Sequence, residues 1–344
     1  MATDGNVSAA LLGLNDIDLL ISDFSSALHG RNIEVMDRPD RGDVIPSWAR
    51  LHSRLSRAFR YATESLDNLM SKREEEEWGR QTTGLHQEAV DSLEDVIYAA
   101  AEVFSFYESD IPYYFNLDSD KSLKNIKSQY VKNIKEQKRF SSGTCNACKH
   151  NHNFLVPVEV KYPDGSRASG FSIYSRSGNV LSVNREIVYD GGAFSFRRTL
   201  INILARVLIA DHHAANLVKN LPDAPAAPPI DCSLHKLPYL TVLKKISSLP
   251  DIGMPGEHPS FEFYRTNTGL INIDREANPA HYEGKHGPAN LSILMLFLGN
   301  DIHFEVPFTG ENFRVQMAAE NGSPSPIAAE MRLDIRDHFI PARE

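Results

Sequence analysis

The spacing of apolar side chains changes along this chain, and that change limits the folds it can adopt. Between residues 11 and 104, apolar residues recur at steps of three and four, as in Trp48, Leu51, Leu55 and Phe59. This spacing predicts amphipathic helices. After about residue 154, short alternating segments are separated by turn sequences such as Pro163–Ser166, which predicts an antiparallel β-meander. We therefore expect an α+β fold, with an N-terminal helical bundle followed by the meander and further helices.

A chain of 344 residues exceeds the size that one hydrophobic core usually reaches, so several parts are expected. We predict an acidic helical bundle in residues 1–115 and a mainly β C-terminal part in residues 251–344. Residues 116–250 would hold a basic helix, a Cys-rich turn, the meander and a helix. The predicted helices cover residues 11–24, 48–66, 85–104, 121–139, 196–221 and 240–249. The predicted strands cover residues 154–162, 170–174, 180–189, 261–264, 270–273 and 303–306.

The composition is that of an ordinary globular protein, with 42% hydrophobic and 24% charged residues. No basic residue precedes the first apolar run, unlike in a secretory signal. The longest strongly apolar run, Leu291–Leu298, is far shorter than the roughly 20 residues of a membrane-spanning helix. We therefore expect a cytoplasmic protein that does not enter the membrane.

Charge is distributed unevenly along the chain, whose formal net charge is −9. Residues 1–115 contain 21 acidic and 10 basic residues, a balance of −11. Residues 121–149 contain eight basic residues against Glu136 alone, a balance of +7. The eight basic residues are Lys121, Lys124, Lys127, Lys132, Lys135, Lys138, Arg139 and Lys149.

At 100° per residue, most of these cations share one side of a helix, opposite Leu123, Ile126, Tyr130 and Ile134. A basic helical face of this kind could contact nucleic-acid phosphates, and Tyr130, Phe140 and Phe154 could offer rings for base stacking. Two other interpretations stay open. The lysines could be a solvated face, or they could dock on the acidic bundle of the same chain or of another subunit in a homo-oligomer.

The segment Thr144–Phe154 contains two of the three cysteines, with the Cys-x2-Cys spacing that suits a tight turn bearing two zinc ligands. Cys232 and His235 form a Cys-x2-His pair beyond a proline-rich connector. We predict a structural Cys3His zinc site made of Cys145, Cys148, Cys232 and His235, which would join the two ends of this part of the chain. The alternatives are a local site that uses His150 or His152, and ordinary buried thiols without metal.

Two motifs indicate phosphoester hydrolysis as an alternative function. Glu159 and Lys161 on a predicted strand resemble the Glu-x-Lys half-motif of restriction-type nucleases, in which the carboxylate binds Mg²⁺. That motif also needs an upstream aspartate, for which Asp118 and Asp120 are the candidates. A solvated strand edge with alternating Glu and Lys is the competing interpretation.

The segment Asp211–His213 resembles the Asp-His-His signature of a phosphoesterase family, although we expect these residues on the exposed side of a helix. The pairs Arg206 with His212, and Arg80 with His86, have the Arg-x5-His spacing of HEPN-type ribonuclease domains, in which two subunits cleave RNA together. The candidate catalytic residues are therefore Glu159, Lys161, His212 and His213.

The common nucleotide-binding, metalloprotease and serine hydrolase motifs do not occur in the sequence. The basic helix and the zinc ligands are contiguous, whereas the hydrolase candidates are scattered. We therefore predict a zinc-stabilised interaction protein that binds nucleic acid or an acidic protein partner. A metal-dependent nuclease or phosphoesterase is the alternative.

Overall fold

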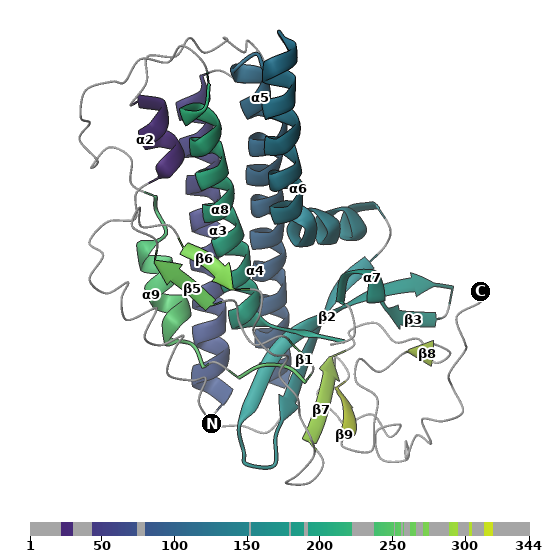
Figure 1. Cartoon of the computed structure of the whole chain (residues 1–344). Coiled ribbons are helices and arrows are strands. Elements are labelled where there is room, and N and C mark those ends of the chain that lie inside the picture. The colour runs from purple at the N-terminus through teal and green to yellow at the C-terminus, as the bar shows by residue number, and fades with distance from the viewer. Residues whose placement is uncertain are drawn as a thin grey trace.

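The computed structural model describes most of residues 22–257 and short strands after them. The described ranges are 22–29, 43–73, 80–150, 153–178, 180–188, 192–221, 237–250, 252–255, 257, 262–265, 271–274, 289–294, 303–304 and 313–318. A group of long helices stands beside a mixed sheet that lies at one end of the group (Figure 1). The α+β class predicted from the sequence is confirmed for these residues.

Four long helices form the helical layer: α3 (Val44–Arg73), α4 (Arg80–Ser105), α6 (Lys121–His150) and α8 (Phe196–Lys219). Helix α4 packs against the other three, and the short α2 (Asp23–His29) packs against α8. Helix α9 (Leu240–Ser248) lies against α3 and α8. The apolar stripes explain these contacts, because the side chains that recur at helical spacing are the buried ones. On α3 they are Trp48, Leu55, Phe59, Leu66 and Leu69.

Helix α4 ends in a π-helical turn, η2 (Phe106–Asp110), which leads into the short α5 (Ile111–Tyr114). In a π-helix each N–H donates to the carbonyl five residues earlier, so the carbonyl of Tyr107 would accept from residue 112. Residue 112 is proline, which has no N–H. The Tyr130 hydroxyl on α6 donates to that carbonyl instead, at 2.7 Å. The turn is thereby tied to α6.

The sheet begins with the predicted meander, in which β1 (Asn153–Lys161), β2 (Arg167–Ser177) and β3 (Val180–Val183) pair antiparallel. Strand β7 (Ala289–Leu294) pairs antiparallel with β1, and β9 (Phe313–Ala318) pairs parallel with β7. The short β4 (Phe194–Ser195) and β8 (His303–Phe304) pair with β2 and β3. Strands β5 (Glu262–Arg265) and β6 (Ile271–Asp274) form a separate hairpin.

Glycine at position 170 allows β4 to approach β2. A Cβ atom at Gly170 would lie 1.8 Å from the Phe194 carbonyl oxygen, so the pairing of these two strands requires a residue without a side chain. Because Phe194 and Ser195 lead directly into α8, this approach also fixes where α8 starts relative to the sheet.

Two local predictions are wrong. The segment Thr144–Phe154 is not a turn over its first half, because α6 continues to His150. Ser141, Thr144, Cys145 and Ala147 continue the buried stripe of α6, and this packing outweighs the modest helix propensity of serine, threonine and cysteine. The strand predicted over residues 180–189 ends at Val183 and is followed by the helical turn α7 (Arg185–Val188).

The prediction of a mainly β region in residues 251–344 and the three-part division stay predictions, since most residues after 257 lie outside the described ranges. The predicted helix over residues 11–24 lies mostly outside the described ranges, which begin at residue 22. The predicted cytoplasmic location also stays a prediction. Among the helices that the structure describes, none has the length and apolar character needed to cross a membrane.

Candidate functional site

The candidate metal ligand Glu159 is buried between α4 and the sheet. Its Oε2 lies 3.4 Å from Nε2 of His86, and its Oε1 lies 3.4 Å from a guanidinium nitrogen of Arg167. The Ser169 hydroxyl donates to Oε2 at 3.5 Å. Only 2% of Glu159 and 1% of His86 are exposed. The expected solvated strand edge is therefore wrong for Glu159, because α4 covers this face of β1.

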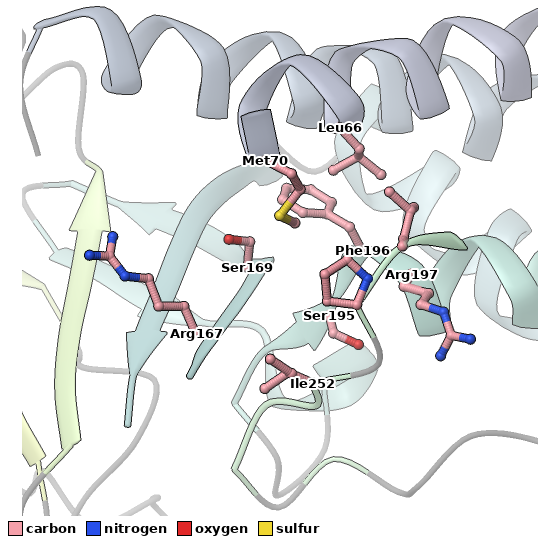
Figure 2. A pocket seen from close by; sticks show the side chains of 10 residues that line it. Leu66, Met70, Arg167, Ser169, Ser195, Phe196, Arg197 and Ile252 are labelled. Carbon is pink, nitrogen blue, oxygen red and sulfur yellow. The ribbon is translucent and has the colours of Figure 1, made fainter. Parts of the chain in front are cut away.

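A small pocket opens beside this cluster, with about 290 Å³ of empty space that includes space open to solvent. It lies between α3, β2, the start of α8 and the segment near Ile252 (Figure 2). The guanidinium groups of Arg167 and Arg197 point away from each other, so they could not both contact one ligand in the pocket. The lining residues are Leu66, Met70, Arg167, Ser169, Ser195, Phe196, Arg197, Leu249, Pro250 and Ile252.

The other parts of the nuclease motif do not join Glu159. Lys161 is exposed at the end of β1. Asp118 forms an ion pair with Lys127 at 2.6 Å, and the Asp120 carboxylate accepts from the Leu123 N–H at the start of α6. Both aspartates lie near α5, at the end of the helical layer away from β1 (Figure 1). Within the described residues, no three His, Cys, Asp or Glu side chains form a group that could hold a metal ion.

The three residues of the Asp-His-His segment face different surroundings on α8. Asp211 is 2% exposed, so the expectation of an exposed position is wrong for this residue. His212 contacts the Asp23 carboxylate through Nδ1 and the Asn216 amide through Nε2, each at 2.9 Å. Burial, with the neighbouring His212, lowers the pKa of His213.

Among the described side chains, Arg206 and His212 do not form a combined site. Arg206 donates to the side chain of Asn202 and to the backbone carbonyl of Glu136, whereas His212 contacts Asp23 and Asn216. The side chain of Arg80 lies outside the described residues. His86 lies beside Glu159, in the cluster under the sheet.

A buried polar network that the sequence analysis missed joins α2, α3, η2, α8 and Tyr239. The Tyr107 hydroxyl donates to Oδ1 of Asp211 at 2.8 Å and accepts from the indole N–H of Trp48 at 3.1 Å. His52 contacts Tyr107 through Nε2 and Tyr239 through Nδ1. The Asp211 carboxylate also accepts from the Ser22 hydroxyl and the Phe24 N–H. A sequence signal existed, because His52 lies within the apolar stripe of α3.

The network assigns one tautomer to His52. The hydroxyl proton of Tyr107 is used toward Asp211, so His52 must donate through Nε2 and accept from Tyr239 through Nδ1. Burial lowers the pKa of His52 to about 3. Burial also raises the pKa of Asp211, which its three donors partly oppose. The side chains of the network are at most 5% exposed, and their hydrogen bonds join four helices and Tyr239.

The basic residues of α6 separate into two sets. Lys127 and Lys138 form ion pairs with Asp118 and Glu108, and the Lys149 ammonium lies 4.6 Å from the centre of the Tyr98 ring. The second set is exposed and lies within about 80° around the helix axis. We call it the outward row, and it consists of Lys121, Lys124, Lys132, Lys135 and Arg139.

The rings expected to stack on bases do not all accompany this row. Tyr130 is 4% exposed and bonded to η2, and Phe140 packs edge-on against Phe194 with ring centres 5.3 Å apart. Only Phe154 is exposed, and one face of its ring already stacks with Tyr174. The outward row is therefore a set of cations without a stacking surface on α6.

Cys145 and Cys148 are three residues apart on α6 and both are free thiols. Burial, together with Glu94 and Cys145, raises the pKa of Cys148 to about 12. His150 is exposed at the end of α6. Cys232, His235 and His152 lie outside the described residues, so the four-ligand zinc site stays a prediction.

Comparison with known proteins gives no relative from which a function could be transferred. The chain matches no protein-family model, no curated protein and no solved structure.

Proposed function

We propose that this protein is a non-enzymatic binding protein whose outward row contacts the phosphate backbone of a nucleic acid. One observation carries the proposal: five exposed cations follow one side of α6 on a chain of net charge −9. The inward-facing Lys127 and Lys138 bond carboxylates of the same chain, so the fold accounts for them. Among the described residues, no carboxylate forms an ion pair with the exposed lysines of the row, which are Lys121, Lys124, Lys132 and Lys135.

The length and composition of the row favour a duplex backbone as the ligand. At 1.5 Å per residue, Lys121 and Arg139 are about 27 Å apart along the axis. Lysine makes point-charge contacts with phosphate, and the rings of α6 are packed against the protein, so these contacts carry no base information. We therefore expect binding that depends little on nucleotide sequence and strongly on salt.

The alternative of phosphoester hydrolysis has less support. The two sets of candidate residues are far apart. Glu159 lies on β1, and the first residue of α8, Phe196, follows β4 at the sheet. His212 is 16 residues further along α8, a rise of about 24 Å away from that end. Glu159 also contacts Arg167, a cation that would compete with a metal ion. An acidic protein partner for the outward row is the other alternative, and the absence of duplex binding in the following experiment would favour it.

The test is binding of a labelled duplex to the full chain across a series of salt concentrations. About four to five phosphate contacts predict a slope of log affinity against log salt near −4. The triple variant Lys124→Glu, Lys132→Glu, Lys135→Glu should reduce that slope by about three. A control variant with the same charge change, Lys72→Glu, Lys161→Glu, Lys219→Glu, alters three other exposed lysines and should bind like the parent. No duplex binding at low salt, or equal losses in both variants, would overturn the proposal.

The proposal keeps a structural zinc ion held by Cys145, Cys148, Cys232 and His235. It is supported by the spacing of the first two cysteines, which are near each other on α6 and next to Glu94. Zinc would favour the thiolate form that burial otherwise opposes at Cys148.

Metal analysis of purified protein tests the zinc prediction. We expect about one zinc per chain in the parent and loss of the metal in both Cys145→Ser and Cys232→Ser. Less than about 0.2 zinc per chain in the parent would contradict it. Retention of zinc in Cys232→Ser alone would show a local site on α6.

A further inference from the structure

A second basic face lies on the first half of α3. Residues 44–63 contain four arginines and no aspartate or glutamate. Arg50, Arg54, Arg57 and Tyr61 follow each other at steps of four, three and four, so they share one side of the helix, and Arg60 lies beside Tyr61. All five side chains are exposed. Over about 16 Å, α3 therefore presents arginines around an aromatic ring.

Within the described part of the chain, an ion pair with a carboxylate accounts for one of these five side chains. Arg54 pairs with Glu102 on α4 at 2.5 Å. Among the described residues, no carboxylate pairs with Arg50, Arg57 or Arg60. Tyr61 is 56% exposed, more than Tyr113, Phe154 or Val180, the other exposed large apolar side chains of the described part. The Arg60 guanidinium carbon lies 5.4 Å from the centre of the Tyr61 ring, so a cation already covers part of the ring.

We propose that Arg50, Arg57, Arg60 and Tyr61 form a binding face for single-stranded nucleic acid, in which Tyr61 stacks on a base and the arginines contact the flanking phosphates. A flat guanidinium binds phosphate with two parallel hydrogen bonds and stacks on bases, which lysine does not do. An exposed tyrosine offers a π-face to any unpaired base, whereas the bases of a duplex are already stacked inside it.

An acidic peptide also complements the charge of this face, but it leaves the exposed ring without a role. The composition of the face therefore favours the nucleic acid. The inference goes beyond the proposed function of α6, because α3 and α6 flank α4 on opposite sides (Figure 1) and each face can bind without the other.

The experiment measures the affinity of the full chain for a labelled single strand of about twelve nucleotides and for the matching duplex. Tyr61→Ala should lower single-strand affinity about tenfold. Tyr61→Phe should stay within about twofold of the parent, because phenylalanine keeps the ring. Tyr113→Ala removes an exposed ring from α5 and should bind like the parent. Arg57→Ala with Arg60→Ala should weaken single-strand binding and flatten its salt slope by about 1.4, two contacts at about 0.7 each.

Three results would overturn the inference. Tyr61→Ala could bind the single strand as tightly as the parent, which would leave the ring without a contact. Tyr61→Ala could lose affinity for the duplex by the same factor as for the single strand, which would show an effect that is not base stacking. Polyglutamate of equal charge could displace the single strand as well as unlabelled strand does, which would identify the face as a site for an acidic protein. The α6 variants are read on the duplex, so failure of either proposal leaves the other testable.

Discussion

Helix α3 has two polar faces that behave in opposite ways. On the buried side, Trp48 and His52 have their donors and acceptors matched by Tyr107 and Tyr239. On the exposed side, Arg50, Arg57 and Arg60 have no carboxylate partner among the described residues. Helix α6 repeats the contrast, with Tyr130 bonded inside and Lys121, Lys124, Lys132 and Lys135 exposed to solvent. Polar groups that the fold satisfies are structural, and those it leaves in solvent are the candidates for function.

Removal of the Asp211 carboxylate should give the largest effect on the stability of the fold. Asp211→Ala leaves the hydroxyls of Tyr107 and Ser22 and the Phe24 N–H without their acceptor in a buried site. We expect the free energy of unfolding to fall by about 3 kcal/mol or more. Urea unfolding measures the loss, and Asp211→Asn, which keeps one acceptor oxygen, should lose less. A loss below about 1 kcal/mol would mean that the network does not hold the helices together.

The pH dependence of stability tests the buried histidine. The folded pKa of His52 is lowered to about 3 from 6.5, so the unfolded chain takes up a proton at higher pH than the folded chain. The stability that neutral His52 contributes is present above pH 6.5 and is lost as the pH falls from 6.5 toward 3, by up to about 1.4 kcal/mol per pH unit. Asp211, whose pKa is raised, acts in the opposite direction, because its folded form binds a proton more readily.

His52→Gln is the matched variant, since the amide can donate to Tyr107 and accept from Tyr239 without titrating. Urea unfolding at pH 7, 6 and 5 should show a decline in the parent that is shallower in His52→Gln. Parallel declines in the two proteins would show that His52 takes up its proton in the folded state as readily as in the unfolded chain.

The helices were predictable from the sequence because their periodicity is local. The buried stripes of α3 and α4 and the basic side of α6 follow from spacing alone. The end of α6 was missed because Thr144, Cys145 and Ala147 are buried by other parts of the chain, and local propensity does not contain that burial. The three-stranded meander was predictable from its turns, such as the one with Gly165 at φ 86°.

The surroundings of the candidate residues were not predictable, because they depend on distant segments. The partner of Asp211 in η2 is 104 residues away, and its partner Ser22 is 189 residues away. Glu159 was expected in solvent because nothing near it in sequence indicates that His86 covers it. The exposed arginines of α3 differ in this respect, since four arginines without an acid in residues 44–63 are visible in the sequence.

The smallest effect on stability is expected for the outward row itself. The variant Lys124→Glu, Lys132→Glu, Lys135→Glu changes exposed side chains that make no ion pair within the described residues, so the free energy of unfolding should change by less than about 1 kcal/mol. The single substitution Lys138→Ala should lower the free energy of unfolding by as much as the triple variant or more. It leaves Glu108, which is 15% exposed, without its cation. Urea unfolding of the two variants decides the comparison. If the triple variant unfolded far more easily than Lys138→Ala, the outward row would be part of the fold, and its cations would need a structural explanation in place of a ligand.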